Sequence, residues 1–149
     1  MAPARDWKKL LADPAGDAIV VIEGGPEAFA DAEKAAAALG LHAARLDGPQ
    51  VCDKKTLLAS LSRQLKFPTY FGGNWDALKD CLTDLSDWIA APGWVVIVTD
   101  ARSLCAHSPL DRQVFLDVVR EAAAFWRREV PPRPLRLVLV QDVLPLSRA

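Results

Sequence analysis

The sequence predicts an α/β fold in which a mainly parallel sheet of three to four strands is flanked by helices. Two observations predict it. Short runs of Val, Ile and Leu recur along the chain, and such runs are typical of strands covered on both faces. Between them lie longer stretches with apolar residues at helical spacing, an alternation typical of parallel sheets. The 149 residues contain no internal repeat or long polar linker, so we expect residues 1–149 to form one domain.

Four segments are expected to be strands because they are short, apolar and mostly aliphatic or β-branched. The second of them is the weakest, since its alanines have little strand propensity. The four segments are AIVVIE at 18–23, HAARL at 42–46, WVVIVT at 94–99 and RLVLV at 136–140.

Helices are expected between these strands. Pro26 suits a first helical turn and Gly40 a C-cap, while Asp53 and Ser108 are good N-cap residues. The expected helices are 26–39, 53–65 and 108–130, with a short one near 5–11. The last should bury one apolar row and end at the prolines at 131 and 132; the row is Leu110, Val114, Val118, Ala122, Phe125 and Trp126.

The composition indicates that any electrostatic function must come from a local patch of the surface. The net charge of −1 and the pI near 6.1 give no overall basic footprint, so we expect no direct nucleic-acid binding. Three cysteines without close spacing indicate a reducing compartment rather than a disulfide framework. No apolar run approaches the ~20 residues that span a bilayer, and the first residues are polar. We therefore expect a cytoplasmic protein with no membrane partner.

One helix carries an unusual concentration of negative charge. Asn74 is a natural N-cap that follows two glycines, and Leu78 begins an apolar row on the helix after it. At about 100° per residue, that row continues through Cys81, Leu82, Leu85 and Ile89, and the opposite side holds Asp76, Asp80, Asp84 and Asp87. A solvated polar face is the simplest interpretation. The alternative is a patch that attracts a partner with a concentrated positive site.

The stretch PTYFGGNWDALKDCLTDL at 68–85 resembles the signature of the barstar family, intracellular inhibitors of barnase-like ribonucleases. In that family a tyrosine-containing turn with glycine and asparagine leads into an acidic helix that fills the ribonuclease active site. The resemblance implies a partner-binding site made of Tyr70, Gly72, Asn74, Trp75, Asp76, Lys79, Asp80, Thr83, Asp84 and Glu121.

The resemblance also implies a role for several of these residues. Asp80 takes the place of the central carboxylate that mimics the substrate phosphate, and Asp76 that of a carboxylate pairing with a second basic group. Tyr70 is the expected aromatic anchor, and Glu121 a peripheral acidic contact. The implied partner is a basic, extracellular-type ribonuclease of the barnase kind or a related toxin nuclease, bound by a chain that is a monomer when free. No catalytic residue, metal or cofactor is implied.

The chain departs from the family pattern in four places, one of which is the segment DLSDWIAAPG at 84–93, longer than the family's usual connection. Lys79 stands where the founding inhibitor has tryptophan, and Gly73 where it has glutamate. Residues 1–42 have no counterpart in the founding protein, and we expect them to be an added strand–helix unit on the sheet, next to a barstar-like core at 43–142.

Other functions remain as alternatives. A barstar-like module could bind a different toxin nuclease or a regulatory protein, and a metal-dependent hydrolase using Asp76 and Asp80 is disfavoured because no base accompanies them. Cys105 and His107 have no partner pair at metal-ligand spacing, so zinc is not expected. Cys81 lies on the apolar row and is expected in the core.

Overall fold

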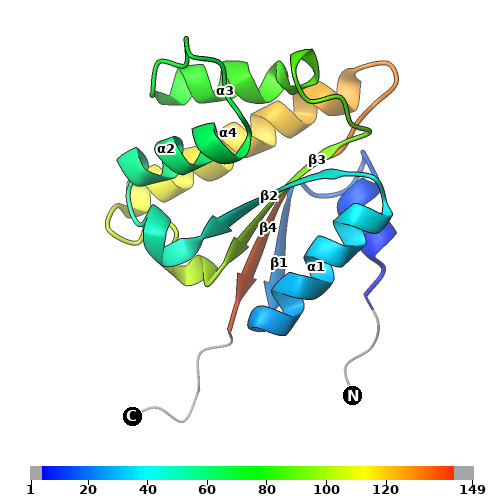
Figure 1. Ribbon diagram of the computed structural model, residues 1–149, viewed down its shortest axis with the longest axis horizontal. Helices are drawn as coiled ribbons and strands as arrows, with labels where there is room; N and C mark the ends of the chain where they lie inside the picture. Colours follow the sequence, from blue (N-terminus) through cyan, green and yellow to red (C-terminus); the bar gives the residue numbers. More distant parts are fainter. Residues whose placement is uncertain (1–4, 143–149) are drawn as a thin grey trace.

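The computed structural model describes residues 5–142, which form a four-stranded parallel sheet with helices on both faces (Figure 1). The strands are β1 (Ile19–Glu23), β2 (His42–Asp47), β3 (Trp94–Thr99) and β4 (Leu135–Gln141), in the order β1-β4-β3-β2. Every neighbouring pair is parallel, so the predicted fold class is confirmed. Each strand agrees with its expected segment to within one residue at either end.

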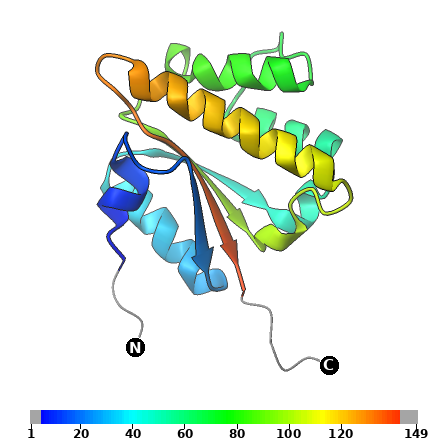
Figure 2. The ribbon, with the colours of Figure 1, turned by 180° about the vertical axis from the view of Figure 1, so that it is seen from behind.

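The helices form two layers. α1 (Pro26–Ala38) and a short π-helix (Lys8–Ala12) cover one face of the sheet, and α2 (Lys54–Gln64), α3 (Trp75–Thr83) and α4 (Pro109–Arg128) cover the other (Figures 1 and 2). α3 packs on α4 on the side away from the sheet, which places it at the outside of its layer (Figure 1). Within the described residues 5–142, no helix is long and apolar enough to cross a membrane.

Both faces of the central strands are buried, which explains their continuous apolar runs. On β3, Trp94, Val96 and Val98 belong to the core beneath α2, α3 and α4. Val95 and Ile97 belong to the core beneath α1. The N-terminal segment therefore closes a face that would otherwise expose aliphatic side chains, each worth about 1.5–3 kcal/mol when fully buried.

A buried arginine joins the N-terminal segment to the sheet. Arg136 on β4 is 1% exposed, and its Nε donates to the carbonyl oxygen of Leu10 at 2.9 Å. Its Nη2 also donates to the carbonyl oxygen of Asp13. These carbonyls lie at the end of the π-helix, where backbone oxygens lack partners within the helix. The hydrogen bonds to these carbonyls offset the free-energy cost of burying the guanidinium, and they complete the end of the π-helix.

Two tryptophans connect the sheet with the outer helices. The rings of Trp94 on β3 and Trp126 on α4 lie 4.6 Å apart between centroids. The indole N–H of Trp126 donates to the carbonyl oxygen of Leu82 at 2.8 Å, and that of Trp94 to the carbonyl oxygen of Ile89 at 3.3 Å. These bonds attach the end of α3 and the segment after it to the core.

The predicted buried row of the last helix is wrong at its beginning. Leu110 is 82% exposed and Val114 37% exposed. The residues that pack inward are Phe115, Val118, Val119, Ala122, Ala123 and Trp126. Apolar residues occupy adjacent rows of this helix, and spacing alone does not decide which row faces the sheet. Asp53 caps α2 as expected, through a bond from the Thr56 N–H, but the Ser108 side chain makes no capping bond to α4.

The acidic helix is shorter than predicted. α3 ends at Thr83, Asp84 is its C-cap, and a 3-10 turn follows at Leu85–Asp87. The change of helix type directs Leu85, which is 0% exposed, into the core. The predicted apolar row through Leu78, Cys81 and Leu82 is buried, as expected.

Candidate functional site

The turn before α3 presents an aromatic side chain to solvent. Asn74 caps the helix, its side-chain oxygen accepting the Ala77 backbone N–H at 2.7 Å. Gly73 has φ +69°, a left-handed conformation that glycine adopts without strain. A Cβ on Gly73 would meet nothing within 4 Å, so the requirement for glycine there is conformational rather than steric. Tyr70, at the start of this turn, is 72% exposed.

Four carboxylates lie exposed along α3 and the 3-10 turn that follows it. They are Asp76, Asp80, Asp84 and Asp87, which we call the acidic face. Among the described residues 5–142, no Lys, Arg or His nitrogen lies within 4.0 Å of these carboxylates. The acidic face is therefore unneutralised from within the part of the chain that the structure describes.

Burial and mutual repulsion both act on the carboxylates of the acidic face. The pKa of Asp84 is raised, first because the side chain is partly desolvated and then because Asp87 and Asp80 are negative. The pKa of Tyr70 is also raised, first by desolvation and then by neighbouring groups that include Asp84, Asp87 and Asp80. The exposed tyrosine therefore stands in the negative field of the carboxylates. The sequence predicted an exposed aromatic side chain beside the acidic patch, and the structure places Tyr70 there.

Lys79 is paired rather than free. Its Nζ lies 3.2 Å from a carboxylate oxygen of Glu121 on α4, and both side chains are about half exposed. The pair crosses between α3 and α4, so the positive charge is balanced beside the acidic face rather than within it. A role for Glu121 in partner binding would compete with this ion pair. No local pattern indicated the pair, because its members lie on different helices.

Trp75 and Thr83 contact their own chain. The Trp75 ring stacks on Phe115 of α4, with centroids 6.5 Å apart and planes 29° apart. The Lys54 ammonium lies 5.3 Å from the centre of the same ring. The Thr83 hydroxyl is 3.1 Å from the carbonyl oxygens of Lys79 and of Asp80, to which it donates. Trp75 is half-buried, and its packing holds the first turn of α3 against α4.

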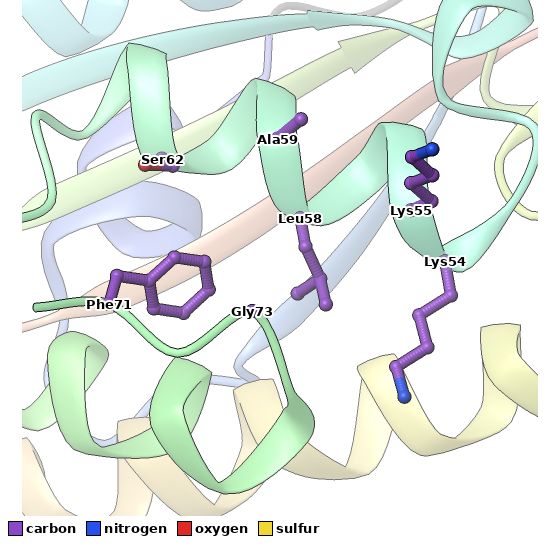
Figure 3. Close-up of a pocket in the computed structure, with 7 residues that line it drawn as sticks. All are labelled: Lys54, Lys55, Leu58, Ala59, Ser62, Phe71 and Gly73. Atoms are coloured by element: carbon purple, nitrogen blue, oxygen red, sulfur yellow. The ribbon is translucent and has the colours of Figure 1, made fainter. Parts of the chain in front are cut away.

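A cleft that the sequence did not predict adjoins the turn before α3 (Figure 3). It has a volume of about 570 Å³ and lies between α2 and the turn before α3. Leu58 and Phe71 project into it from its two sides, and the Lys54 side chain extends at one end (Figure 3). The other lining residues are Lys55, Ala59, Ser62 and Gly73. Nothing distinguished these α2 residues from an ordinary amphipathic helix in the sequence.

The candidate metal ligands among the described residues lie apart from the acidic face. In residues 5–142, side chains able to hold a metal gather in one place, Cys52, Asp53 and His107, and none of the four aspartates belongs to it. Cys81 behind the acidic face is 2% exposed, and burial raises the pKa of its thiol, which makes it a core residue rather than a nucleophile. The arrangement suits recognition of a positive surface.

Comparison with known families agrees with the geometry. The family model described as Barstar (barnase inhibitor) matches residues 41–139, about two thirds of the chain. The match covers β2, β3, the three helices of one layer, the whole acidic face and β4 as far as residue 139, and it begins after α1. A search of curated proteins finds no match to this chain. The chain belongs to the barstar family.

Proposed function

We propose that this protein binds a barnase-like ribonuclease in the cytoplasm and blocks its active site with the acidic face, as an antidote or immunity factor. The observation that carries the proposal is the set of four exposed aspartates on α3 and the turn after it, which have no cationic partner among the described residues. They lie within the stretch that the barnase-inhibitor family model matches. The family is one of inhibitors, and the proposed activity is binding rather than catalysis.

The chemistry of the target explains the charge. A ribonuclease holds its substrate phosphates with positive groups, so an inhibitor that fills that site must be negative and rigid. Asp76, Asp80 and Asp84 recur at every fourth residue, and like charges at this spacing cost a helix about 0.2–0.5 kcal/mol per pair. A basic partner removes this repulsion, and the relief favours the complex. The caps and packing of α3 hold the carboxylates in place before binding.

Individual residues take different parts in the proposed contact. Asp80 lies in the middle of α3 and Asp76 in its first turn. In the proposed complex Asp80 occupies the position of the substrate phosphate, and Asp76 pairs with a second basic group. Tyr70 lies across the turn as the aromatic contact, with Asn74 and Gly72 shaping the backbone between them. The cleft beside Phe71 is a place for a side chain of the ribonuclease.

A second candidate is a different toxin nuclease as the target. The Lys79–Glu121 ion pair favours it, because a charged pair occupies a position where the founding inhibitor has an aromatic ring. The same surface and the same acidic chemistry are used in both cases, and only the contacts on the α4 side differ.

Inhibition of RNA cleavage tests the proposal. The reduced full-length protein is titrated into a barnase-like ribonuclease and into a panel of basic toxin nucleases, and residual RNA cleavage is followed. Asp80→Ala should weaken binding by about 2–5 kcal/mol or more, a range that measurements on barnase–barstar complexes helped to define. Its effect on folding should be about 0.5 kcal/mol or less, as for other exposed side chains.

Asp31→Ala is the matched control. Asp31 is an exposed helical aspartate on α1, across the sheet from the acidic face, and its loss should leave inhibition unchanged. Equal inhibition by wild type and Asp80→Ala would remove Asp80 from the central position. Failure to inhibit any nuclease of the panel would reject the proposed function.

A further inference from the structure

Three side chains with metal-binding atoms meet away from the acidic face. Cys52 follows the 3-10 turn Gly48–Val51, Asp53 is the N-cap of α2, and His107 lies in the turn before α4. One ligand atom of each lies within 4.8 Å of the other two. Both loops leave the carboxyl ends of neighbouring parallel strands, β2 and β3, an edge of α/β sheets where ligands commonly bind.

Backbone hydrogen bonds hold the two loops together at this point. The Cys105 N–H donates to the carbonyl oxygen of Val51 at 2.9 Å, and the His107 N–H donates to the carbonyl oxygen of Cys52 at 3.0 Å. Cys52 and His107 are thus directly bonded through their main chains. Their side chains are neighbours because the loops are joined, and not because two mobile groups happen to meet.

A glycine lets these loops approach so closely. A Cβ on Gly48 would lie 2.0 Å from the carbonyl oxygen of Asp100, a distance that no side chain tolerates. Gly48 has φ outside the left-handed range, so its role is to admit the backbone of the other loop. The close approach sets the separation of the ligand atoms further along both loops.

The carboxylate of Asp53 is oriented by its capping role. Its Oδ1 accepts the Thr56 backbone N–H at 2.9 Å and the Thr56 hydroxyl at 2.7 Å. Both bonds go to the same oxygen, which leaves Oδ2 to act as a ligand. A ligand whose second oxygen is already hydrogen-bonded is the usual arrangement around protein metal ions.

We propose that Cys52 Sγ, Asp53 Oδ2 and an imidazole nitrogen of His107 bind Zn²⁺. Zinc takes sulfur at about 2.3 Å and nitrogen or oxygen at about 2.0–2.2 Å, so tetrahedral ligands lie about 3.3–3.8 Å apart. The present separations are at most 4.8 Å, so they need to close by no more than about 1–1.5 Å, and the exposed His107 ring can turn toward the other two. Three protein ligands leave a fourth position for water.

The donor set selects among metal ions. Thiolate and imidazole favour zinc and related transition ions, whereas Mg²⁺ and Ca²⁺ prefer oxygen ligands alone. A thiolate and a carboxylate together balance the two positive charges of Zn²⁺. Sequence reasoning considered Cys105 with His107 and found no site, but Cys105 is 0% exposed in the core, and the structure places His107 beside Cys52 instead.

The bound ion would act as a clamp between the loop before α2 and the loop before α4. Because it binds only to the folded arrangement, the ion should raise the melting temperature, and above its Kd the rise should grow with the logarithm of its free concentration. The acidic face lies along α3 and the 3-10 turn after it and supplies no ligand to the ion, so nuclease inhibition should persist in protein that cannot bind zinc. The zinc-site proposal and the nuclease-inhibitor proposal can therefore be refuted independently of each other.

Cobalt substitution tests the site directly, since Co²⁺ bound by a thiolate absorbs in the near ultraviolet and visible range. Reduced full-length protein is titrated with Co²⁺, then with Zn²⁺ to displace it, and melting temperature is measured with and without Zn²⁺. We expect one equivalent of cobalt, a thiolate charge-transfer band, its loss on adding zinc, and a rise in melting temperature.

Single variants identify the ligands. Cys52→Ser should abolish the charge-transfer band. His107→Ala removes a ligand, so it should weaken cobalt binding by more than the roughly 10–100-fold that loss of an outer-shell partner costs. Asp53→Asn keeps a capping oxygen for Thr56 but loses the charge, so it should weaken binding without unfolding α2. Cys105→Ala is the matched control and should retain the band. Absence of the band in wild type, its survival in Cys52→Ser, or its loss in Cys105→Ala alone would overturn the proposal.

Discussion

Replacing Asp84 by asparagine should stabilise the free protein, because this carboxylate lies in an unfavourable place. Asp80 stands four residues before it and Asp87 three residues after it, and each such like-charged neighbour costs about 0.2–0.5 kcal/mol. Asp84 is also the C-cap of α3, where a negative charge opposes the helix dipole at a cost of about 0.3–1 kcal/mol. Asparagine keeps the shape of the side chain and removes the charge.

The expected gain is about 0.5–1.5 kcal/mol after allowance for solvent screening of exposed charges. For a chain of this size, that corresponds to a rise of about 1–5 °C in melting temperature. The folded-state pKa of Asp84 is raised, so the folded protein takes up this proton more readily than the unfolded chain. The cost is therefore present at neutral pH, and it disappears as the pH falls through the folded-state pKa toward the ordinary value of 3.8.

Thermal and urea unfolding of Asp84→Asn at neutral and acid pH, each at low and high salt, measures the effect. The gain should shrink at high salt, since the Debye length falls from ~10 Å at 0.1 M to ~3 Å at 1 M. Asp31→Asn, on α1 away from the acidic face, should change stability by about 0.5 kcal/mol or less. A variant less stable than wild type at neutral pH, or a gain independent of pH and salt, would refute the reasoning.

Three further predictions concern the complex, the core and the sheet. Added salt should slow association with a basic nuclease far more than it speeds dissociation, and stopped-flow mixing at several salt concentrations measures both rates. Trp126→Phe leaves the buried Leu82 carbonyl oxygen without its donor, which should cost at least about 1–3 kcal/mol in urea unfolding. The folded-state pKa of His42 is lowered, first by desolvation and then by Lys66. The stability that His42 contributes above pH 6.5, its ordinary pKa, should therefore be lost as the pH falls through the lower folded-state pKa. Urea unfolding of His42→Gln at several pH values should show a flatter dependence of stability on pH.

Local rules predicted the strands and most helix ends because the responsible interactions are close in sequence. Pro26 in a first turn, the Asp53 cap and the Asn74 cap each act within a few residues. The faces of β3 were not predictable in this way. Val95 and Val96 are equally apolar, and only the positions of α1 and α4 decide which core each one enters. Likewise, only long-range pairing places β1 beside β4 rather than beside β2.

In the candidate site too, features set by local sequence spacing were predictable, and contacts between different helices were not. The acidic face follows from helical spacing and from Leu78 and Cys81 being apolar. The Lys79–Glu121 ion pair and the contact of Trp75 with Phe115 join α3 to α4, and the spacing within either helix contains no information about them.

The distribution of local conflicts supports a binding role for α3 more strongly than its charge alone. Elsewhere in the described residues, polar side chains find partners within the chain: Asp53 and Thr56 cap each other, and buried Arg136 completes a helix end. Around α3, neighbouring carboxylates repel one another, Asp84 opposes the helix dipole and Tyr70 stands 72% exposed. A folded chain in which most local preferences agree with the structure tolerates such conflicts mainly at functional sites. A cationic partner resolves these conflicts together, since it neutralises the carboxylates and covers the tyrosine. The charge repulsion that lowers the stability of the free protein at this helix is then relieved in the complex, and this relief favours binding.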